Sequence, residues 1–233
     1  MSELRLPGNP ELRVRLRRSG RARRLSLRIS SLDGRVTLTL PQRVPEREGR
    51  AFLLEKEDWI RSHLAKQPEQ LLVGPGCRLP LEGEEVEIRT ASGRRIQRGA
   101  GVIEVPEPAA ARRLERYLRE LARERLAEAS DHYADRLGRR YSSLTLRDTR
   151  SRWGSCSSGG GLMYSWRLIL APREVLRYVA AHEVAHLKEM NHSRAFWALV
   201  EDLYGDYRAA RRWLQGEGNA LHRYRFEAME EGD

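Results

Sequence analysis

The sequence predicts an α+β protein with a β-rich N-terminal part followed by a more helical C-terminal part. Between Glu11 and Leu40, charged and apolar residues alternate, which is the period of strands with one buried face. From about Ala109 onward, apolar residues recur instead at helical intervals. We therefore expect one part over residues 1–105 and a second part over residues 106–233.

The first part is expected to begin with three short antiparallel strands in the runs LRVRLRR, RRLSLRIS and GRVTLTLP. Asp33-Gly34 supplies the turn between the last two. A single amphipathic helix should follow from Glu46 to Ala65, because its apolar residues have helical spacing. Further strands are expected at Glu84–Ile88, Arg94–Arg98 and Gly101–Val105.

The second part is expected to open with a long helix from about Ala109 to Leu137, which Gly138 ends. A strand at Leu144–Arg147 and another at Leu162–Leu170 should follow, joined through a glycine-rich turn. The next helix would then begin directly after a hairpin.

Composition places the chain among ordinary globular proteins, with 40% hydrophobic and 33% charged residues. No run approaches the roughly eighteen apolar residues of a membrane helix. The first ten residues lack the apolar core of a signal peptide, so a cytoplasmic location is expected. The two cysteines, Cys77 and Cys156, lie too far apart in the sequence to suggest a disulfide framework.

The net charge of +10 comes almost wholly from arginine, because Lys56, Lys66 and Lys188 are the only lysines. A positive field attracts nucleic acids, nucleotides or acidic proteins. A solvated arginine-rich surface is the commoner interpretation of such a composition. The densest cluster consists of Arg17, Arg18, Arg21, Arg23 and Arg24.

His182, Glu183 and His186 have the spacing His-Glu-x-x-His within a stretch of helical period. Residues four apart share one helix face, so both histidines can bind a single metal ion. Glu183 then lies beside the ion, where it can take a proton from a bound water. An apolar stripe separate from the histidines is formed by Leu176, Ala180, Val184 and Leu187.

His192 is the expected third ligand, but an unbroken helix would carry it about 9 Å along the axis from His186 and roughly 240° around it. The helix must therefore break, and Asn191 tolerates the left-handed conformation of a helix end. Ser193 can then cap the next helix. Three histidines leave one position for water, which is the pattern of a catalytic zinc site.

Glu201 or Asp202 on the following helix would be the alternative third ligand. Other residues that could support or line the site are Arg152, Trp153, Ser155 and Cys156. Trp153 and Trp166 can equally be core packing, and Cys156 is expected to be chemically quiet, because a fourth ligand would exclude water. His132 and His222 receive no catalytic role.

The chain resembles the YgjP-like predicted zinc hydrolases. The resemblance rests on SRWGSCSS at Ser151 to Ser158, WRLILAP at Trp166 to Pro172 and YVAAHEVAHLKEMNHSRAFW at Tyr178 to Trp197. It implies a zincin-like minimal peptidase domain, related to SprT-like domains, with His182, His186 and His192 as ligands of one zinc ion and Glu183 as catalytic acid/base. Ser165 and Gly205 depart from the typical asparagine and proline.

The leading hypothesis is a zinc-dependent hydrolase, an intracellular metallopeptidase in which a metal-activated water attacks a peptide or protein substrate. In related peptidases a strand beside the metal helix holds the substrate as an added strand, and Met163–Leu168 is the candidate. Candidates for a second oxyanion donor are Tyr164, Tyr178, Arg152 and Tyr207.

Two alternatives remain open at this stage. A nucleoside triphosphate pyrophosphatase would suit the arginine excess, although the chain has no glycine-rich phosphate loop. The second alternative is a basic module that associates with nucleic acid through its basic N-terminal sheet and has a catalytically idle metal site.

Overall fold

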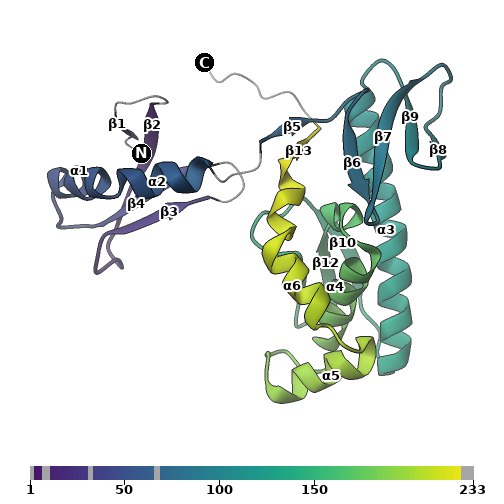
Figure 1. The fold of residues 1–233 in the computed structure, drawn as a ribbon. Coiled ribbons are helices and arrows are strands. Elements are labelled where there is room, and N and C mark those ends of the chain that lie inside the picture. The colour runs from purple at the N-terminus through teal and green to yellow at the C-terminus, as the bar shows by residue number, and fades with distance from the viewer. Residues whose placement is uncertain (1–2, 7–10, 31–33, 66–68, 227–233) are drawn as a thin grey trace. The chain divides into compact units, whose positions relative to one another are not determined.

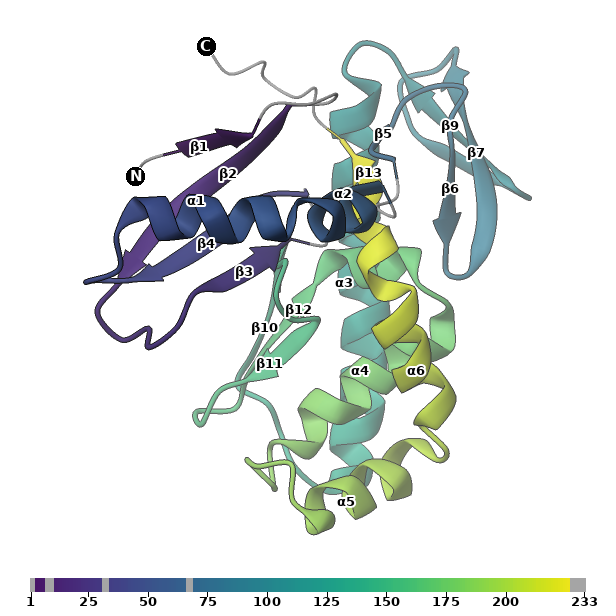
Figure 2. The same cartoon turned by 60° about the vertical axis from the view of Figure 1, so that its left-hand side comes forward.

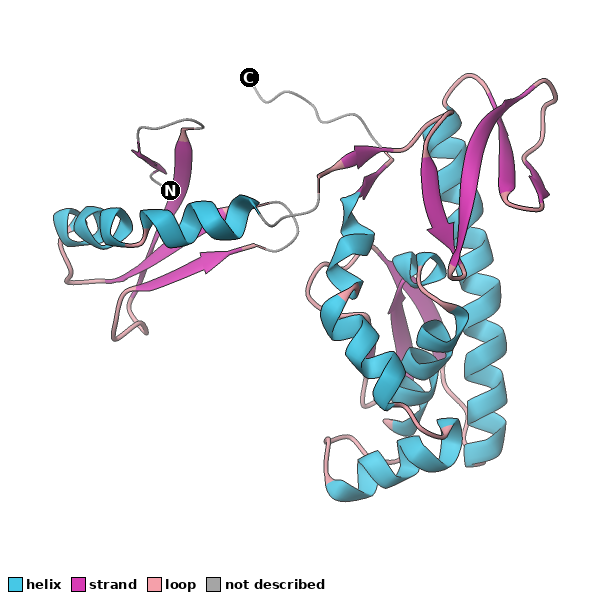
Figure 3. Ribbon diagram, in the orientation of Figure 1, coloured by secondary structure: helices cyan, strands magenta, loops and turns pink. Residues whose placement is uncertain are grey.

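The computed structural model describes residues 3–6, 11–30, 34–65 and 69–226. It divides into two compact units, Met1–Glu69 and Gln70–Asp233. Each unit combines helices with strands, which confirms the expected α+β class (Figures 1 and 3). Within the described ranges, no helix has both the length and the apolar character needed to cross a membrane.

The first unit is a mixed four-stranded sheet with two helices. Its elements are β1 (Glu3–Leu6), β2 (Leu12–Ser19), β3 (Ser26–Ile29), β4 (Val36–Pro41), α1 (Glu46–Glu55) and α2 (Glu57–Ala65). The strand order is β1-β2-β4-β3, and β2 pairs with β4 in parallel, so the expectation of an all-antiparallel arrangement was wrong. Alternating residues define a buried face but not which strand lies beside it. Of the expected turn, Gly34 is described (φ 67°), whereas Asp33 lies outside the described residues.

The core of the first unit lies between one face of this sheet and its helices. Alternate residues of β2 and β4 are buried, and Leu53 of α1 and Ile60 of α2 are fully buried with them. Gly49 lets α1 approach the sheet, because a Cβ there would lie 3.0 Å from a methyl group of Leu40. The single helix expected from Glu46 to Ala65 is broken at Lys56.

The second unit contains the remaining elements. Its strands are β5 (Leu71–Leu72), β6 (Arg78–Leu81), β7 (Glu84–Ala91), β8 (Gln97–Gly99), β9 (Val102–Pro106), β10 (Ser143–Arg147), β11 (Gly154–Cys156), β12 (Gly161–Ser165) and β13 (Tyr224–Arg225). Its helices are α3 (Ala110–Leu137), η1 (Trp166–Leu170), α4 (Arg173–Ala185), α5 (Arg194–Tyr204), α6 (Arg208–Gly216) and η2 (Gly218–Arg223). Figure 2 shows the α4, α5 and α6 segments along with α3.

The division between the units falls upstream of the boundary expected at residues 105 and 106. Ile103 and Val105 of β9 share one hydrophobic core with Leu114 and Leu118 of α3. The sheet β6-β7-β9-β8 is therefore part of the second unit. The proline-containing segment after β9 joins a strand to a helix within one core and does not separate two domains.

A second sheet in this unit has the order β10-β12-β11. β12 pairs with β10 in parallel and with β11 antiparallel, so it is the central strand. The strand expected over Leu162–Leu170 ends at Ser165, and the chain continues as the 3-10 helix η1. Trp166 and Leu168 of η1 are fully buried, so their apolar character reflects core packing.

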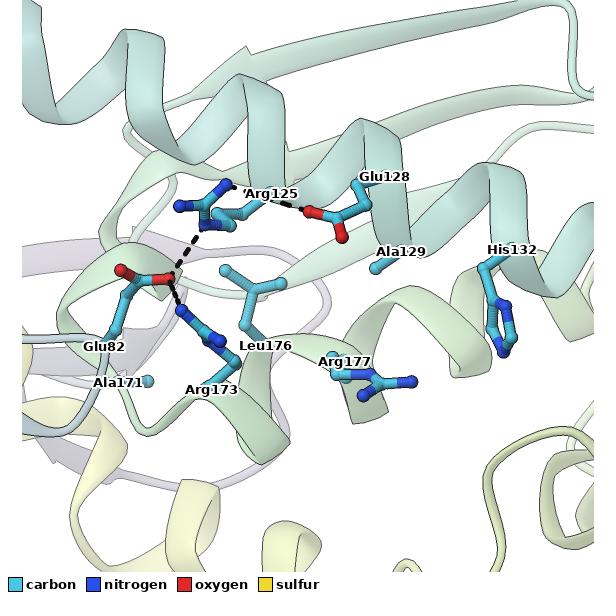
Figure 4. A pocket seen from close by; sticks show the side chains of 9 residues that line it. All are labelled: Glu82, Arg125, Glu128, Ala129, His132, Ala171, Arg173, Leu176 and Arg177. Carbon is cyan, nitrogen blue, oxygen red and sulfur yellow. Dashed lines mark hydrogen bonds and ion pairs between the residues drawn. The ribbon is translucent and has the colours of Figure 1, made fainter.

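Glu82 fixes the start of α4 against α3 (Figure 4). It forms a two-residue hairpin turn with Gly83, with φ angles of 52° and 90°, and a Cβ on Gly83 would lie 3.1 Å from Pro172 Cα. Glu82 accepts hydrogen bonds from Arg125 Nε (2.9 Å) and Arg173 Nη2 (3.0 Å). Burial acts to raise the pKa of this carboxyl, but the surrounding guanidiniums outweigh burial and lower the pKa below its ordinary value.

Candidate metal centre

α4 carries the first two histidines and ends where the second one stands. His182 and Glu183 lie in its last turns, and His186 is the C-cap residue, with φ −64° and ψ −16°. A turn follows, in which the amides of Leu187 and Lys188 bond back to the carbonyls of Val184 and Ala185. The chain can then leave the helix axis directly after the second histidine.

The break differs in detail from the expected left-handed Asn191. No positive φ occurs at Asn191, which instead accepts a hydrogen bond from the Ser193 amide through Oδ1 at 3.2 Å. Ser193 is the N-cap of α5, because its hydroxyl accepts from the Phe196 amide at 3.2 Å. These two side chains hold the turn that returns His192 to α4.

The three histidines converge through their Nε2 atoms. His192 Nε2 lies 3.1 Å from Nε2 of His186 and 3.1 Å from Nε2 of His182. A tetrahedral zinc ion bonded to nitrogen separates two ligand atoms by about 3.3 Å, so the spacing fits one ion. His182, His186 and His192 form a group of ligand atoms within 4.8 Å of one another, and no acidic side chain among the described residues joins that group.

The tautomer and charge of these rings suit metal binding. His186 Nδ1 lies 2.8 Å from the Glu189 carbonyl, and donation to it leaves the Nε2 lone pair for a metal. Burial lowers the pKa of His182 to about 3 and also lowers that of His186, so both rings are neutral at physiological pH. His182 Nδ1 is buried and has no hydrogen-bond partner among the described residues.

Aromatic side chains hold the three imidazoles. Phe196 stacks on His186 at 4.4 Å between ring centroids, and Trp197 stacks on His192 at 5.7 Å. Tyr178 meets His182 edge-on at 6.0 Å. Phe196 and Trp197 lie in the first turn of α5, so their contacts with the histidines depend on how α5 crosses α4.

Glu183 lies beside the histidines in a buried position, 6% exposed. Burial raises the pKa of its carboxyl to about 8, with Arg152 acting in the opposite direction. The charge of a bound cation also favours the ionised form. A carboxyl group in this place can exchange a proton with a neighbouring water.

Gly154 is a site residue that the sequence patterns did not reveal. A Cβ at this position would lie 2.6 Å from both Cγ and Oε1 of Glu183, which no real Cβ contact allows. β11 can therefore approach the carboxylate only through a glycine. The glycine in SRWGSCSS was the available signal, but the need for it arises from a contact distant in sequence.

The other predicted lining residues have mixed roles. Trp153 is partly buried, with its ring 5.3 Å from the His222 ring, and a Cβ on Gly218 would lie 3.2 Å from its Cζ2. Burial raises the pKa of the Cys156 thiol, and Glu183 adds to this effect, so the thiol stays protonated. Tyr164 is fully buried and bonded to Ser130 at 3.0 Å, which removes it as an oxyanion donor.

The strand expected to hold substrate is not available for that role. Met163 lies in β12, whose two edges are already paired with β10 and β11. Trp166 and Leu168 lie in η1 and are buried. Within the described part of this sheet, β11 is the edge strand beside α4.

The fold and the histidine cluster together define an α+β protein with a candidate metal site at the end of a helix. A family model described as YgjP-like, metallopeptidase domain, matches residues 23–217, and the chain belongs to this family. The match confirms the resemblance indicated by the sequence motifs and supports a metal-dependent peptidase at the level of the family.

A solved structure is also similar, the metallopeptidase zymogen abylysin of Pyrococcus abyssi. The match has 24% sequence identity and a TM-score of 0.36, and it covers 40% of the present chain and 95% of the abylysin chain. No curated protein matches the chain.

Proposed function

We propose that the protein is a zinc-dependent peptidase whose ion is held by His182, His186 and His192. The observation that carries the proposal is the convergence of three Nε2 atoms at the end of α4, the helix on which the buried Glu183 directly follows His182. Zinc bound there supplies a Lewis acid that polarises a carbonyl and makes a water more acidic. Family membership supports the same activity.

Glu183 is the residue that we assign to proton transfer. It follows His182 directly on α4, and contact with Gly154 limits where its carboxyl group can lie. The carboxylate accepts a proton from the attacking water and then delivers it to the departing amine. Burial favours the protonated form of the group, which makes the first transfer, from the water to the carboxylate, easier.

β11 is the strand that we assign to substrate binding, in place of β12. It pairs with β12 along one edge, and the order β10-β12-β11 leaves its other edge without a strand in the described sheet. An extended peptide can add to such an edge through backbone hydrogen bonds. Gly154 in β11 would place that peptide next to Glu183.

The test is to offer zinc-loaded protein both casein and a panel of nucleotides. We expect casein hydrolysis, and we expect Glu183→Gln to lower it at least about 100-fold while zinc remains bound. Pyrophosphate release that depends on Glu183, without proteolysis, would instead assign the protein to the nucleotide hydrolases. Arg152 and Arg211 near the site are the observation that keeps this alternative open.

A nucleic-acid partner is the remaining candidate. On the second unit, a hollow of about 280 Å³ is lined by four arginines and one acid, namely Arg94, Arg95, Arg113, Arg116 and Glu120, together with Ile96 and Tyr117. A binding role predicts strongly salt-dependent affinity for DNA or RNA that survives Glu183→Gln. Lack of binding at low salt would eliminate this candidate.

A further inference from the structure

Arg211 on α6 lies close to the histidine cluster. Its Cζ is 4.5 Å from the centroid of the Trp197 ring, a cation–π distance. That ring stacks on His192 and lies 5.6 Å from the His182 ring. Trp197 therefore contacts both the guanidinium and the rings of two proposed metal ligands.

The donors of Arg211 are not used by the protein. The side chain is exposed, and among the described residues its guanidinium has no hydrogen bond or ion pair in addition to the ring contact. Two acids of this region pair with another arginine, because Arg208 lies 3.1 Å from Asp206 and 3.6 Å from Glu201. The guanidinium of Arg211 is therefore available to an anion from outside the chain.

The charges around the site favour an anionic ligand. The guanidinium of Arg211 is one such positive charge, held over a ring that contacts the rings of His182 and His192. Among the described residues, no carboxylate oxygen joins the ligand atoms of the three histidines, and Glu183 is assigned to proton transfer. Any bound cation adds further positive charge.

We infer that Arg211 binds a carboxylate of the substrate, so that the peptidase favours an acidic or carboxy-terminal residue near the scissile bond. The inference rests on the proposed function. A guanidinium fork matches a carboxylate with two parallel hydrogen bonds, and the Trp197 ring lowers the entropy lost in ordering the side chain. A phosphate commonly needs several converging donors, whereas Arg211 supplies a single fork.

The experiment measures binding rather than turnover. Zinc-loaded protein is titrated calorimetrically with acetohydroxamic acid and with the monohydroxamates of succinic, glutaric and adipic acids, each beside its methyl ester. The hydroxamate provides the same metal-binding group throughout, and the series varies the reach of the carboxylate. We expect at least one free acid to bind about tenfold tighter than its ester.

Arg211→Gln should abolish this difference and leave the affinity for acetohydroxamic acid unchanged. Arg212→Gln, which removes a charge from the neighbouring exposed position, should preserve it. The inference is overturned if no acid exceeds its ester, or if the difference survives Arg211→Gln. If acetohydroxamic acid itself does not bind, the result contradicts the proposed zinc site, and the inference about Arg211 is then overturned with it.

Two further arms identify the source of the anion. Two sets of peptides compete with the bound monohydroxamate. One set has a free carboxy-terminus, and the other contains glutamate but ends in an amide. The set that competes more strongly shows whether Arg211 binds a terminal or a side-chain carboxylate. Pyrophosphate is the third competitor. Displacement by pyrophosphate that depends on Arg211, without displacement by either peptide set, would overturn the assignment to a carboxylate.

Discussion

At the scale of single residues, Gly154 lies against the side chain of Glu183. A Cβ on Gly154 would lie 2.6 Å from Cγ and Oε1 of Glu183, so the Glu183 side chain would have to shift to admit any larger residue. The glycine thus acts as a positioning residue. Its effect on catalysis should pass entirely through Glu183.

Gly154→Ala should lower peptide hydrolysis about 100-fold, because the added methyl group displaces the Glu183 carboxyl group from its place beside the ion. Zinc content should remain that of the unchanged protein, since no histidine is among the nearest neighbours of the new methyl group. Activity assays and metal analysis on the same preparation check both statements. Gly159→Ala is the matched control, because its nearest neighbour is Ser157 Oγ at 4.0 Å. Equal losses for both variants would contradict the positioning role.

At the scale of elements, the cap of α5 links a local sequence signal to the metal centre. Ser193 directly follows His192, and its hydroxyl satisfies the Phe196 amide. The same hydrogen bond that starts α5 therefore orients the chain at the third histidine.

Ser193→Ala should lower the free energy of unfolding by about 1 kcal/mol, the usual cost of a lost N-cap. It should also weaken zinc binding, because the turn that carries His192 becomes less ordered. Denaturant unfolding and competition with a chelator measure the two effects. Ser193→Asp, which keeps a capping oxygen, should restore stability, and an unchanged zinc affinity in Ser193→Ala would argue against the coupling.

The ion pairs of Glu82 with Arg125 and Arg173 should stabilise the start of α4 in a pH-dependent way. Glu82→Gln should reduce the free energy of unfolding by roughly 2 kcal/mol at about pH 7, less than for a fully buried pair because the arginines remain partly exposed. The pKa of Glu82 in the folded protein is lower than its ordinary value of 4.5, which applies to the unfolded chain. The ionised carboxylate therefore stabilises the fold fully above the unfolded pKa, and this stabilisation is lost as the pH falls through the folded pKa.

The difference in free energy of unfolding between the unchanged protein and Glu82→Gln should therefore shrink when unfolding is measured at about pH 3. Glu84→Gln, a change at an exposed carboxylate in the same hairpin, should have little effect at either pH. A constant difference for Glu82→Gln across this range would show that its carboxylate charge is not what stabilises α4.

Local patterns predicted these elements unevenly. The long helix α3 and the helix of the histidine motif were predictable, because helical period and the chemistry of His182 and His186 are both local. The end of β12 at Ser165 was not, since buried strands and buried 3-10 turns share an apolar composition. Gly154 and Arg211 escaped prediction because their neighbours come from distant segments.

At the scale of the whole molecule, each unit has its own hydrophobic core. The proline-rich segment near residue 106 suggested a boundary, but burial of Val105 with Leu114 depends on how β9 packs on α3. Periodicity along the chain carries no information on that packing. The three histidines proposed as metal ligands all belong to the unit that begins at Gln70.

A fragment of residues 70–233 should fold alone and bind zinc, because its core and its histidines are complete. A fragment of residues 106–233 should not fold stably, because it lacks β6 to β9 and exposes the α3 residues that pack on them. Thermal unfolding by circular dichroism and zinc titration compare the two. Cooperative unfolding of the shorter fragment would restore the boundary at residue 106.

The central claim is that His182, His186 and His192 bind one zinc ion through their Nε2 atoms. Anomalous diffraction at the zinc edge from a crystal of the zinc-loaded protein tests it most directly. We predict a single strong peak about 2.0–2.1 Å from all three Nε2 atoms. A peak bonded to only two of these histidines, or located elsewhere, would contradict the claim.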